Sequence, residues 1–190
     1  MLIIGVSGKA KAGKDTFVEI LRDKIVLFDI KRQINIQVIP FAKRLKEIVI
    51  QKFPEFKKNI DAKDALGRKL LQFLGTDFYR ETVDEGFWIK ELKKQLNMYT
   101  DILLIPDCRF ENEIEMLNNL EEPHLGDVGI HVHINNDNVP LLDHKSEGRL
   151  TDYKVDIRLD NSLTIDKFER EIVKKVYNQL VLPILKKNVT

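Results

Sequence analysis

The residues from Gly8 to Thr16 have the types and spacing of a loop that binds phosphate. Gly8 is followed after four residues by Gly13 and Lys14, which is the first part of a Walker A pattern, and Thr16 supplies the hydroxyl one position later than usual. Glycines let the backbone take unusual φ/ψ values and approach phosphate oxygens closely. In such a loop the backbone N–H groups face an anion at a helix N-terminus, the lysine reaches the β- and γ-phosphates, and a hydroxyl ligates Mg²⁺. These residues therefore predict a nucleotide-dependent phosphotransferase.

The segments on either side place this loop between a buried strand and a helix. Leu2–Val6 is a short apolar run typical of a central parallel strand, and apolar residues recur at helical spacing from Phe17 to Ile25. This context favours a phosphate loop over a glycine-rich turn with exposed lysines. Whether Lys9 and Lys11 contact phosphate or only solvent stays open. The residues expected to bind the nucleotide here are Gly8, Lys11, Ala12, Gly13, Lys14, Asp15 and Thr16.

A second group of candidate residues follows an apolar run further along the chain, between Asp107 and Glu113. Open parallel sheets bind their ligands at the C-terminal ends of the strands. Asp107 could hold Mg²⁺ with its water shell or orient the acceptor, and Arg109 could neutralise the transferring phosphate. Glu113 could join the site or only pair with Arg109 on a helix surface. We take Lys14, Arg109 and Asp107 as catalytic candidates, and Thr16 and Asp107 as candidate metal ligands.

Two arginines, Arg68 and Arg80, lie in a helical stretch that a Gly-Thr pair is expected to break. They could converge on one anionic group, because a guanidinium can contact phosphate through two parallel hydrogen bonds. The alternative, which the spacing alone favours, is a solvated surface with Asp64, Asp77, Glu81 or Asp84 as partners. Trp88 and Phe78 could stack on a base, although aromatic residues at helical spacing more often pack in a core.

The segment from His144 to Arg149 could be a mobile lid that brings cations over the phosphates and excludes water, or a polar surface loop. Asn161 could line a purine pocket, or it could belong to the N-cap region of the last helix. The four histidines lack metal-like spacing, which argues against a metal site at His131 and His133.

Strands and helices alternate along the chain, which predicts an α/β fold with a parallel sheet. The expected strands are 2–6, 34–41, 101–107, 128–134 and 155–159. The expected helices include 42–53 and 165–185. An extra helical stretch, 61–97, is too long for a simple crossover and lies where a kinase would bind its acceptor.

Composition narrows the class of protein. With 190 residues, 43% hydrophobic and 32% charged, the chain fits one compact domain. A net charge of +1 gives no signature of nucleic-acid binding and suits a small substrate better. The single cysteine, Cys108, excludes an internal disulfide and suits a reducing compartment; we expect it to be a small packing residue. No apolar run is long enough to span a bilayer and no cleavable signal pattern is seen, so we expect a cytoplasmic protein.

Five segments in order resemble the phage-type deoxynucleoside monophosphate kinases, over nearly the whole chain. They are the phosphate loop 8–16, then 41–47, then 68–77 with Arg80 and Trp88, then 107–113, and then 144–147. The resemblance implies an adenylate-kinase-like, three-layer P-loop kinase fold, with a five-stranded parallel sheet and helices on both faces. It implies a single domain, 1–190, with a helical acceptor-binding region at 41–97 and a short lid at 137–153.

The resemblance also implies a reaction and roles for residues. The γ-phosphoryl group of ATP, bound with Mg²⁺, would pass to a deoxynucleoside monophosphate for dNTP supply, in the host cytoplasm if the chain is phage-encoded. It favours Arg68 and Arg80 as the clamp on the acceptor phosphate and places Trp88 near the base. The implied substrate-binding residues are Arg68, Arg80, Trp88, Glu113, His144 and Glu147. Arg149 would join the phosphate loop in binding ATP, and Asn161, from its place after the last strand, is a further candidate for binding the nucleotide.

Two departures from the family pattern leave alternatives open. Lys43-Arg44 stands where these kinases often have an acidic or small residue followed by proline, and the Gly-Lys-Asp-Thr ending also occurs in animal-type phosphomevalonate kinases. A small-metabolite kinase, such as a dephospho-coenzyme A kinase, would use Asp107 as a base toward a hydroxyl. A regulatory nucleotide-binding ATPase is a further alternative, and a homodimer is possible.

Overall fold

The computed structural model describes residues 1–28, 34–117, 128–140 and 150–187. Their contacts divide into two compact units. The first, here called the sheet unit, combines Met1–Val38 with Asn97–Thr190. The second, here called the helical unit, is Ile39–Leu96.

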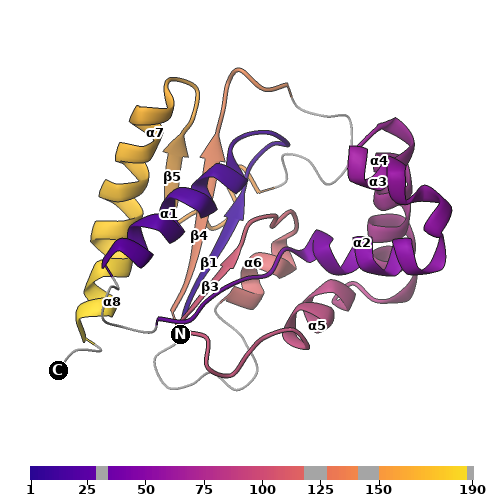
Figure 1. The fold of residues 1–190 in the computed structure, drawn as a ribbon, viewed down its shortest axis with the longest axis horizontal. Coiled ribbons are helices and arrows are strands. Elements are labelled where there is room, and N and C mark those ends of the chain that lie inside the picture. The colour runs from indigo at the N-terminus through magenta and orange to yellow at the C-terminus, as the bar shows by residue number, and fades with distance from the viewer. Residues whose placement is uncertain (29–33, 118–127, 141–149, 188–190) are drawn as a thin grey trace. The chain divides into compact units, whose positions relative to one another are not determined.

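The sheet unit is built on five parallel strands in the order β2-β3-β1-β4-β5 (Figure 1). β1 is central, and all six of its residues are buried, as expected for a strand with helices on both faces of the sheet. The α/β fold with a five-stranded parallel sheet is therefore confirmed. The strands are β1 (Leu2–Ser7), β2 (Ile36–Val38), β3 (Ile102–Ile105), β4 (Val128–Asn135) and β5 (Ile157–Asp160).

Helices pack on both faces of this sheet (Figure 1). On one face, α1 (Lys14–Phe28) and a continuous C-terminal helix enclose the main apolar core with the side chains of Leu2, Ile4 and Val6. On the other face lies α6 (Glu111–Leu117), which approaches so closely that a Cβ on Gly5 would lie 2.7 Å from the Cδ1 atom of Leu117. The C-terminal helix consists of α7 (Ile165–Glu171), η3 (Ile172–Val181) and α8 (Leu182–Lys187).

The second strand is shorter than expected. β2 ends at Val38, and Phe41, which the sequence pattern assigned to this strand, is instead the first residue of α2 (Phe41–Lys52). Pro40 explains the difference, because it has no N–H to continue a strand ladder and its fixed φ suits the start of a helix. Phe41 is buried, so the apolar run in the sequence continues across a change of secondary structure.

The helical unit contains no strand among its residues. Its elements after α2 are η1 (Pro54–Phe56), α3 (Lys57–Ala62), α4 (Ala65–Gln72), η2 (Phe73–Val83) and α5 (Phe87–Lys93). Asp64 caps α4 by accepting a hydrogen bond from the backbone N–H of Gly67 at 2.8 Å. None of the helices in the described ranges, in either unit, is long and apolar enough to cross a membrane.

The expected Gly-Thr break in this unit is wrong. Helix α4 runs directly into η2, so the chain is helical through Gly75 and Thr76. The glycine serves packing, since a Cβ there would lie 2.7 Å from the Cδ2 atom of Leu45 on α2. The turns of η2 are wider than those of an α-helix, with the N–H of Asp84 bonded to the carbonyl of Tyr79 at 2.9 Å.

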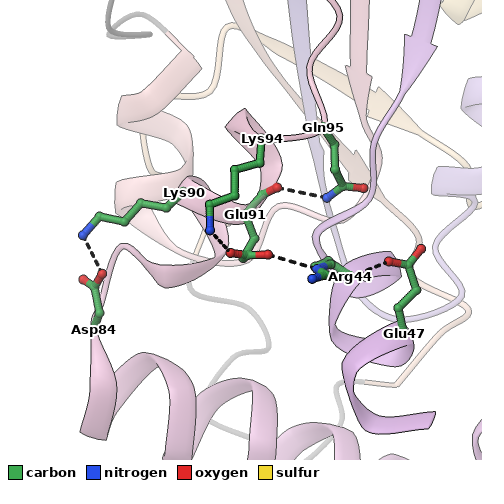
Figure 2. A network of polar contacts seen from close by, with 7 residues as sticks. All are labelled: Arg44, Glu47, Asp84, Lys90, Glu91, Lys94 and Gln95. Atoms are coloured by element: carbon green, nitrogen blue, oxygen red, sulfur yellow. Dashed lines mark hydrogen bonds and ion pairs between the residues drawn. The ribbon is translucent and has the colours of Figure 1, made fainter. Parts of the chain in front are cut away.

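A polar network joins α2 to α5 within the helical unit (Figure 2). Glu91 is 8% exposed and accepts hydrogen bonds from Arg44 at 2.9 Å and from Lys94. These bonds, first that from Lys94 and then that from Arg44, lower the pKa of the Glu91 carboxyl. Arg44 also contacts Glu47 at 3.3 Å. Arg44, one of the residues that departs from the family pattern, therefore has a structural role here.

Candidate active site

The loop between β1 and α1 has a backbone shape that its glycines make possible. Gly8 and Gly13 have φ values of +137° and +104°, and Lys11 between them has φ +65°. A Cβ on Gly8 would lie 2.4 Å from the carbonyl oxygen of Ile134, and one on Gly13 would lie 2.3 Å from the Nδ2 atom of Asn161. Both positions therefore require glycine for space as well as for conformation. The expected phosphate-binding residues sit in a loop of this unusual shape.

The ammonium group of Lys14 lies over this loop. It donates hydrogen bonds to the carbonyl oxygens of Gly8 and Lys9, both at 2.7 Å. Lys14 is also the first residue of α1, a helix long enough for its N-terminus to attract an anion. A cation, the N-terminus of a helix and a glycine loop are the features that bind a polyphosphate. Of the other loop lysines, Lys9 donates to the carbonyl of Val139 at 3.1 Å and Lys11 is exposed.

Residues around Lys14 complete the start of α1. Ala12 is buried and its N–H closes a turn onto the carbonyl of Lys9 at 3.1 Å. Asp15 is exposed in the first helical turn, where its charge complements the helix dipole. Thr16 is half-buried, one position beyond Asp15.

Asn161 is brought to the same loop from the other end of the chain. It follows β5, and its side-chain amide donates to the carbonyl of Ala12 at 2.9 Å while it packs over Gly13. Its own N–H bonds the carbonyl of Asn135 on the neighbouring strand at 2.9 Å. The N-cap of the last helix is Thr164, not Asn161. Asn161 thus holds the phosphate loop in place.

The segment after β3 lies beside the end of β1. The N–H of Cys108 donates to the carbonyl of Val6 at 3.0 Å, and the Cys108 side chain is buried, as expected for a packing residue. Burial, followed by the negative charges of Glu113 and Asp107, raises the pKa of the thiol, and the charge of Lys14 acts in the opposite direction. The charges of Asp107 and Lys14 therefore both influence the Cys108 thiol at this edge of the sheet.

Glu113 has a different place from the one expected. It is 2% exposed, and one carboxylate oxygen accepts hydrogen bonds from the backbone N–H groups of Arg109 at 2.7 Å and Phe110 at 3.2 Å. This is the glutamate half of a capping box, at the third residue of α6. Glu113 therefore fixes the backbone that carries Arg109, whereas Asp107 and Arg109 are themselves partly exposed.

Sequence reasoning missed a cluster next to the loop. Ser7, the last residue of β1, lies between His131 and His133 of β4, with its hydroxyl oxygen 2.6 Å from one ring and 2.8 Å from the other. Burial lowers the pKa of both histidines, that of His133 to about 4. The alternation of the histidines along a strand indicates a shared face. The position of Ser7 opposite them depends on strand order and register, which the sequence does not reveal.

The two candidate arginines of the helical unit are in unlike environments. Arg80 is 5% exposed and donates from Nη1 to the carbonyl of Glu85 at 3.2 Å. Arg68 is exposed and donates from Nε to the carbonyl of Lys63 at 2.7 Å. Two of the acidic residues considered as partners are engaged elsewhere: Asp64 caps α4 and Asp84 pairs with Lys90 at 2.7 Å (Figure 2).

Trp88 is buried in the helical unit. Its indole N–H donates to the carbonyl of Gly75 at 2.7 Å, and its ring lies edge-on to those of Tyr79 and Phe87. This environment fits the packing alternative for Trp88. Phe78 is 42% exposed at the edge of the same aromatic group. His144, Glu147 and Arg149, and with them most of the expected lid, lie outside the described residues.

Comparison with known proteins bears on the identity of this site. A family model described as deoxynucleotide monophosphate kinase matches residues 25–172, while a search of curated proteins found no match. The matched stretch begins after the phosphate loop, so the loop and the family match are separate observations. The match covers both candidate arginines and the segment that contains Asp107. With most of its length matched, the chain belongs to the deoxynucleotide monophosphate kinase family, whose members are ATP-dependent phosphotransferases.

Proposed function

We propose that this protein transfers the γ-phosphoryl group of ATP to a deoxynucleoside monophosphate, giving the diphosphate for dNTP supply in the cytoplasm. The observation that carries the proposal is the shape of the phosphate loop, with the Lys14 ammonium held over it by the carbonyls of Gly8 and Lys9. It stands beside the family match over residues 25–172. A donor nucleotide would bring its phosphates to this loop and to the N-terminus of α1.

The donor side needs groups that offset negative charge as the phosphoryl moves. The Lys14 ammonium would contact the β- and γ-phosphates during the transfer. Arg109, whose backbone is fixed by Glu113, would neutralise charge on the transferring group. Thr16 and Asp107 offer a hydroxyl and a carboxylate oxygen. Mg²⁺ prefers oxygen ligands, and it usually takes only one or two from the protein, with phosphate oxygens and water as the others. When bound, Mg²⁺ would neutralise charge on the β- and γ-phosphates.

We assign binding of the acceptor, the deoxynucleoside monophosphate, to the helical unit. Arg80 and Arg68 would hold the acceptor phosphate, and the buried Arg80 is the better preorganised of the two because its surroundings restrict its rotamers. A phosphate monoester is already anionic near neutral pH, so its oxygen can attack in line without a protein base.

Asp107 distinguishes this proposal from a small-metabolite kinase. If the acceptor were a hydroxyl, as in dephospho-coenzyme A, a carboxylate base would be needed, and Asp107 is a partly exposed carboxylate at a strand end. Asp107→Asn would then abolish transfer to that hydroxyl while Mg-ATP still binds. With a phosphate acceptor, Asp107 is no base, and Asp107→Asn should weaken the positioning of Mg²⁺ and the phosphates. The variant should then need a higher Mg²⁺ concentration to reach half of its maximal rate.

The first test is to incubate the purified protein with Mg-ATP and each of a panel of dNMPs, NMPs and dephospho-coenzyme A, and to separate the products by chromatography. A dNDP product is expected. As a matched pair of loop variants, Lys14→Ala should lower kcat by about 100-fold or more. Lys11→Ala removes the other lysine of this loop that we expect to bind the nucleotide, and because Lys11 is exposed its loss should lower kcat less than the loss of Lys14. Phosphorylation of dephospho-coenzyme A alone, or ATP hydrolysis without any acceptor, would contradict the proposal.

A further inference from the structure

A chain of buried polar side chains lies directly before the phosphate loop. Ser7, His131 and His133 are 1%, 1% and 6% exposed. The Ser7 hydroxyl oxygen lies 2.6 Å from Nε2 of His131 and 2.8 Å from Nδ1 of His133. Nδ1 of His131 in turn lies 3.0 Å from the carbonyl oxygen of Tyr153 and 3.2 Å from that of Lys154. These contacts join β1, β4 and the segment before β5.

The chemistry of the end groups fixes the direction of each hydrogen bond. Carbonyl oxygens only accept, so Nδ1 of His131 carries the proton. Burial disfavours the charged ring, so Nε2 of His131 keeps its lone pair and accepts from the Ser7 hydroxyl. The Ser7 oxygen then accepts from Nδ1–H of His133. The hydrogen bonds therefore all point one way, from His133 through Ser7 and His131 to the Tyr153 carbonyl.

The middle member of this chain adjoins the groups that would bind phosphate. Ser7 is bonded covalently to Gly8, whose carbonyl accepts from the Lys14 ammonium at 2.7 Å. Gly8 is also in van der Waals contact with β4, where any Cβ would meet the carbonyl of Ile134. The Lys14 charge is one of the causes that lower the pKa of His133, so the cluster is within electrostatic reach of the loop. A shift of the Ser7 backbone, which the hydrogen bonds of its side chain restrain, would thus move the carbonyl that holds Lys14.

Burying the three polar side chains of Ser7, His131 and His133 costs free energy, because each must be removed from water. Valine or isoleucine would fill a strand position facing α6 without any buried polar group to satisfy, and a half-satisfied buried network is worse than an apolar one. A directional chain of hydrogen bonds gives what apolar packing does not, which is one fixed orientation of the Ser7 side chain. That orientation is useful where the next residue begins a strained loop.

We propose that His131 is a positioning residue for the phosphate loop, acting through the hydroxyl of Ser7. The inference rests on the proposed function in taking Mg-ATP as the ligand of the loop. His131 accepts the Ser7 proton with one ring nitrogen and is itself held by the Tyr153 and Lys154 carbonyls through the other. Its effect is on the affinity for the donor nucleotide and not on the acceptor.

Two amide variants of His131 separate its two nitrogens. His131→Gln places an amide oxygen near the position of Nε2, so it can still accept from Ser7. His131→Asn places an amide N–H near the position of Nδ1, so it keeps the carbonyl contacts and loses Ser7. Isothermal titration with Mg-ATP should show a Kd within about twofold of wild type for the Gln variant and about fivefold weaker for the Asn variant, the equivalent of one hydrogen bond.

A double variant tests whether the effect passes through Ser7. Ser7→Ala should weaken Mg-ATP binding as much as His131→Asn does, and the combination of both changes should be no weaker than Ser7→Ala alone. The KM for the dNMP should be unchanged in every variant. Thermal unfolding shows which proteins are folded, and Ser7→Ala, the smallest change, serves if a histidine variant fails to fold.

The opposite order of affinities would overturn the inference. If His131→Asn binds Mg-ATP like wild type while His131→Gln is weakened, His131 acts only as an anchor for the segment before β5. If all variants lose thermal stability but bind Mg-ATP equally, the chain is structural packing. If the wild-type protein itself does not bind Mg-ATP, the proposed function falls, and this inference falls with it.

Discussion

At the scale of single residues, the candidate site depends on the backbone angles of Gly8 and Gly13 and on the carboxylate of Glu113, which fixes the backbone of Arg109. Gly8 and Gly13 were expected in a phosphate loop, and both adopt positive φ values there. Glu113 was harder to interpret, because a carboxylate four residues after Arg109 can face either the site or the backbone. In the structure it caps α6 and fixes the Arg109 backbone. Phe110 has no side-chain oxygen, so the Ser/Thr of a capping box is missing and only the glutamate at the third helical position was a signal in the sequence.

Protonation of His133 should make the protein less stable in mild acid. Its pKa falls from the ordinary 6.5 to about 4, through burial first and then through electrostatic interactions with His131, Arg158 and Lys14, against the negative charge of Asp152. Between these two values the unfolded chain binds more protons than the folded one. The free energy of unfolding should therefore fall as the pH drops from about 6.5 toward 4, and it should be insensitive to this group above 6.5.

Urea denaturation at intervals of pH measures this effect. His133→Asn keeps a donor toward Ser7 but cannot titrate, so its stability should fall less steeply across the same window, with the remaining slope coming from His131, whose pKa is also lowered. Carboxyls with lowered pKa, such as Glu91 and Asp84, start from ordinary values of 4.5 and 3.8 and act at lower pH. Equal slopes for wild type and variant between pH 6.5 and 4.5 would contradict the assignment.

At the scale of elements, apolar periodicity predicted the strands and the long terminal helices well, and it failed where the cause lies in another element. The run that includes Phe41 was extended too far as a strand because apolar side chains continue into α2 past Pro40. Gly75 was taken as a helix breaker, whereas it makes room for Leu45 of α2 inside a continuous helix. The Ser7 cluster depends on the pairing of β1 with β4, which is a property of the sheet and not of either strand.

The two glycines of the α4–η2 helix should respond differently to alanine. A Cβ on Gly67 would lie 2.3 Å from the backbone carbonyl oxygen of Asn59, so α3 and α4 would have to move apart. We expect Gly67→Ala to lower the free energy of unfolding by about 1–3 kcal/mol, even though alanine favours the helix. A Cβ on Gly75 would meet only the end of the Leu45 side chain, which can turn away, so Gly75→Ala should have the smaller effect.

Chemical denaturation of both variants beside the wild type gives the comparison, with the slope against urea showing whether the unfolding remains two-state. The pair is matched because both glycines lie in one helix and gain the same intrinsic helix propensity. If Gly67→Ala proved as stable as Gly75→Ala, the close approach of α3 to α4 would not be a constraint on this position.

At the scale of the whole molecule, the proposed reaction assigns donor and acceptor binding to different units. The phosphate loop, Asp107 and Arg109 belong to the sheet unit, and Arg68 and Arg80 belong to the helical unit. Substitutions in the sheet unit should therefore change the affinity for Mg-ATP, and substitutions in the helical unit should change the affinity for the dNMP. Composition alone could not show which part of the chain binds the donor and which binds the acceptor, because basic and acidic residues are dispersed along the chain.

Arg80→Lys is the sharpest test of the acceptor assignment. It keeps the charge and most of the buried stem but removes the planar fork that can contact a phosphate through two hydrogen bonds, so kcat/KM for the dNMP should fall by about 10- to 100-fold. The Kd for Mg-ATP, measured by titration, should stay within about twofold because the donor residues lie in the other unit. Arg68→Lys, at an exposed arginine, is the matched control and should have a smaller effect, since an exposed guanidinium is less preorganised. Equal, small effects of both substitutions on kcat/KM would leave both arginines with structural roles in the helical unit and move the acceptor phosphate to other cations of the chain.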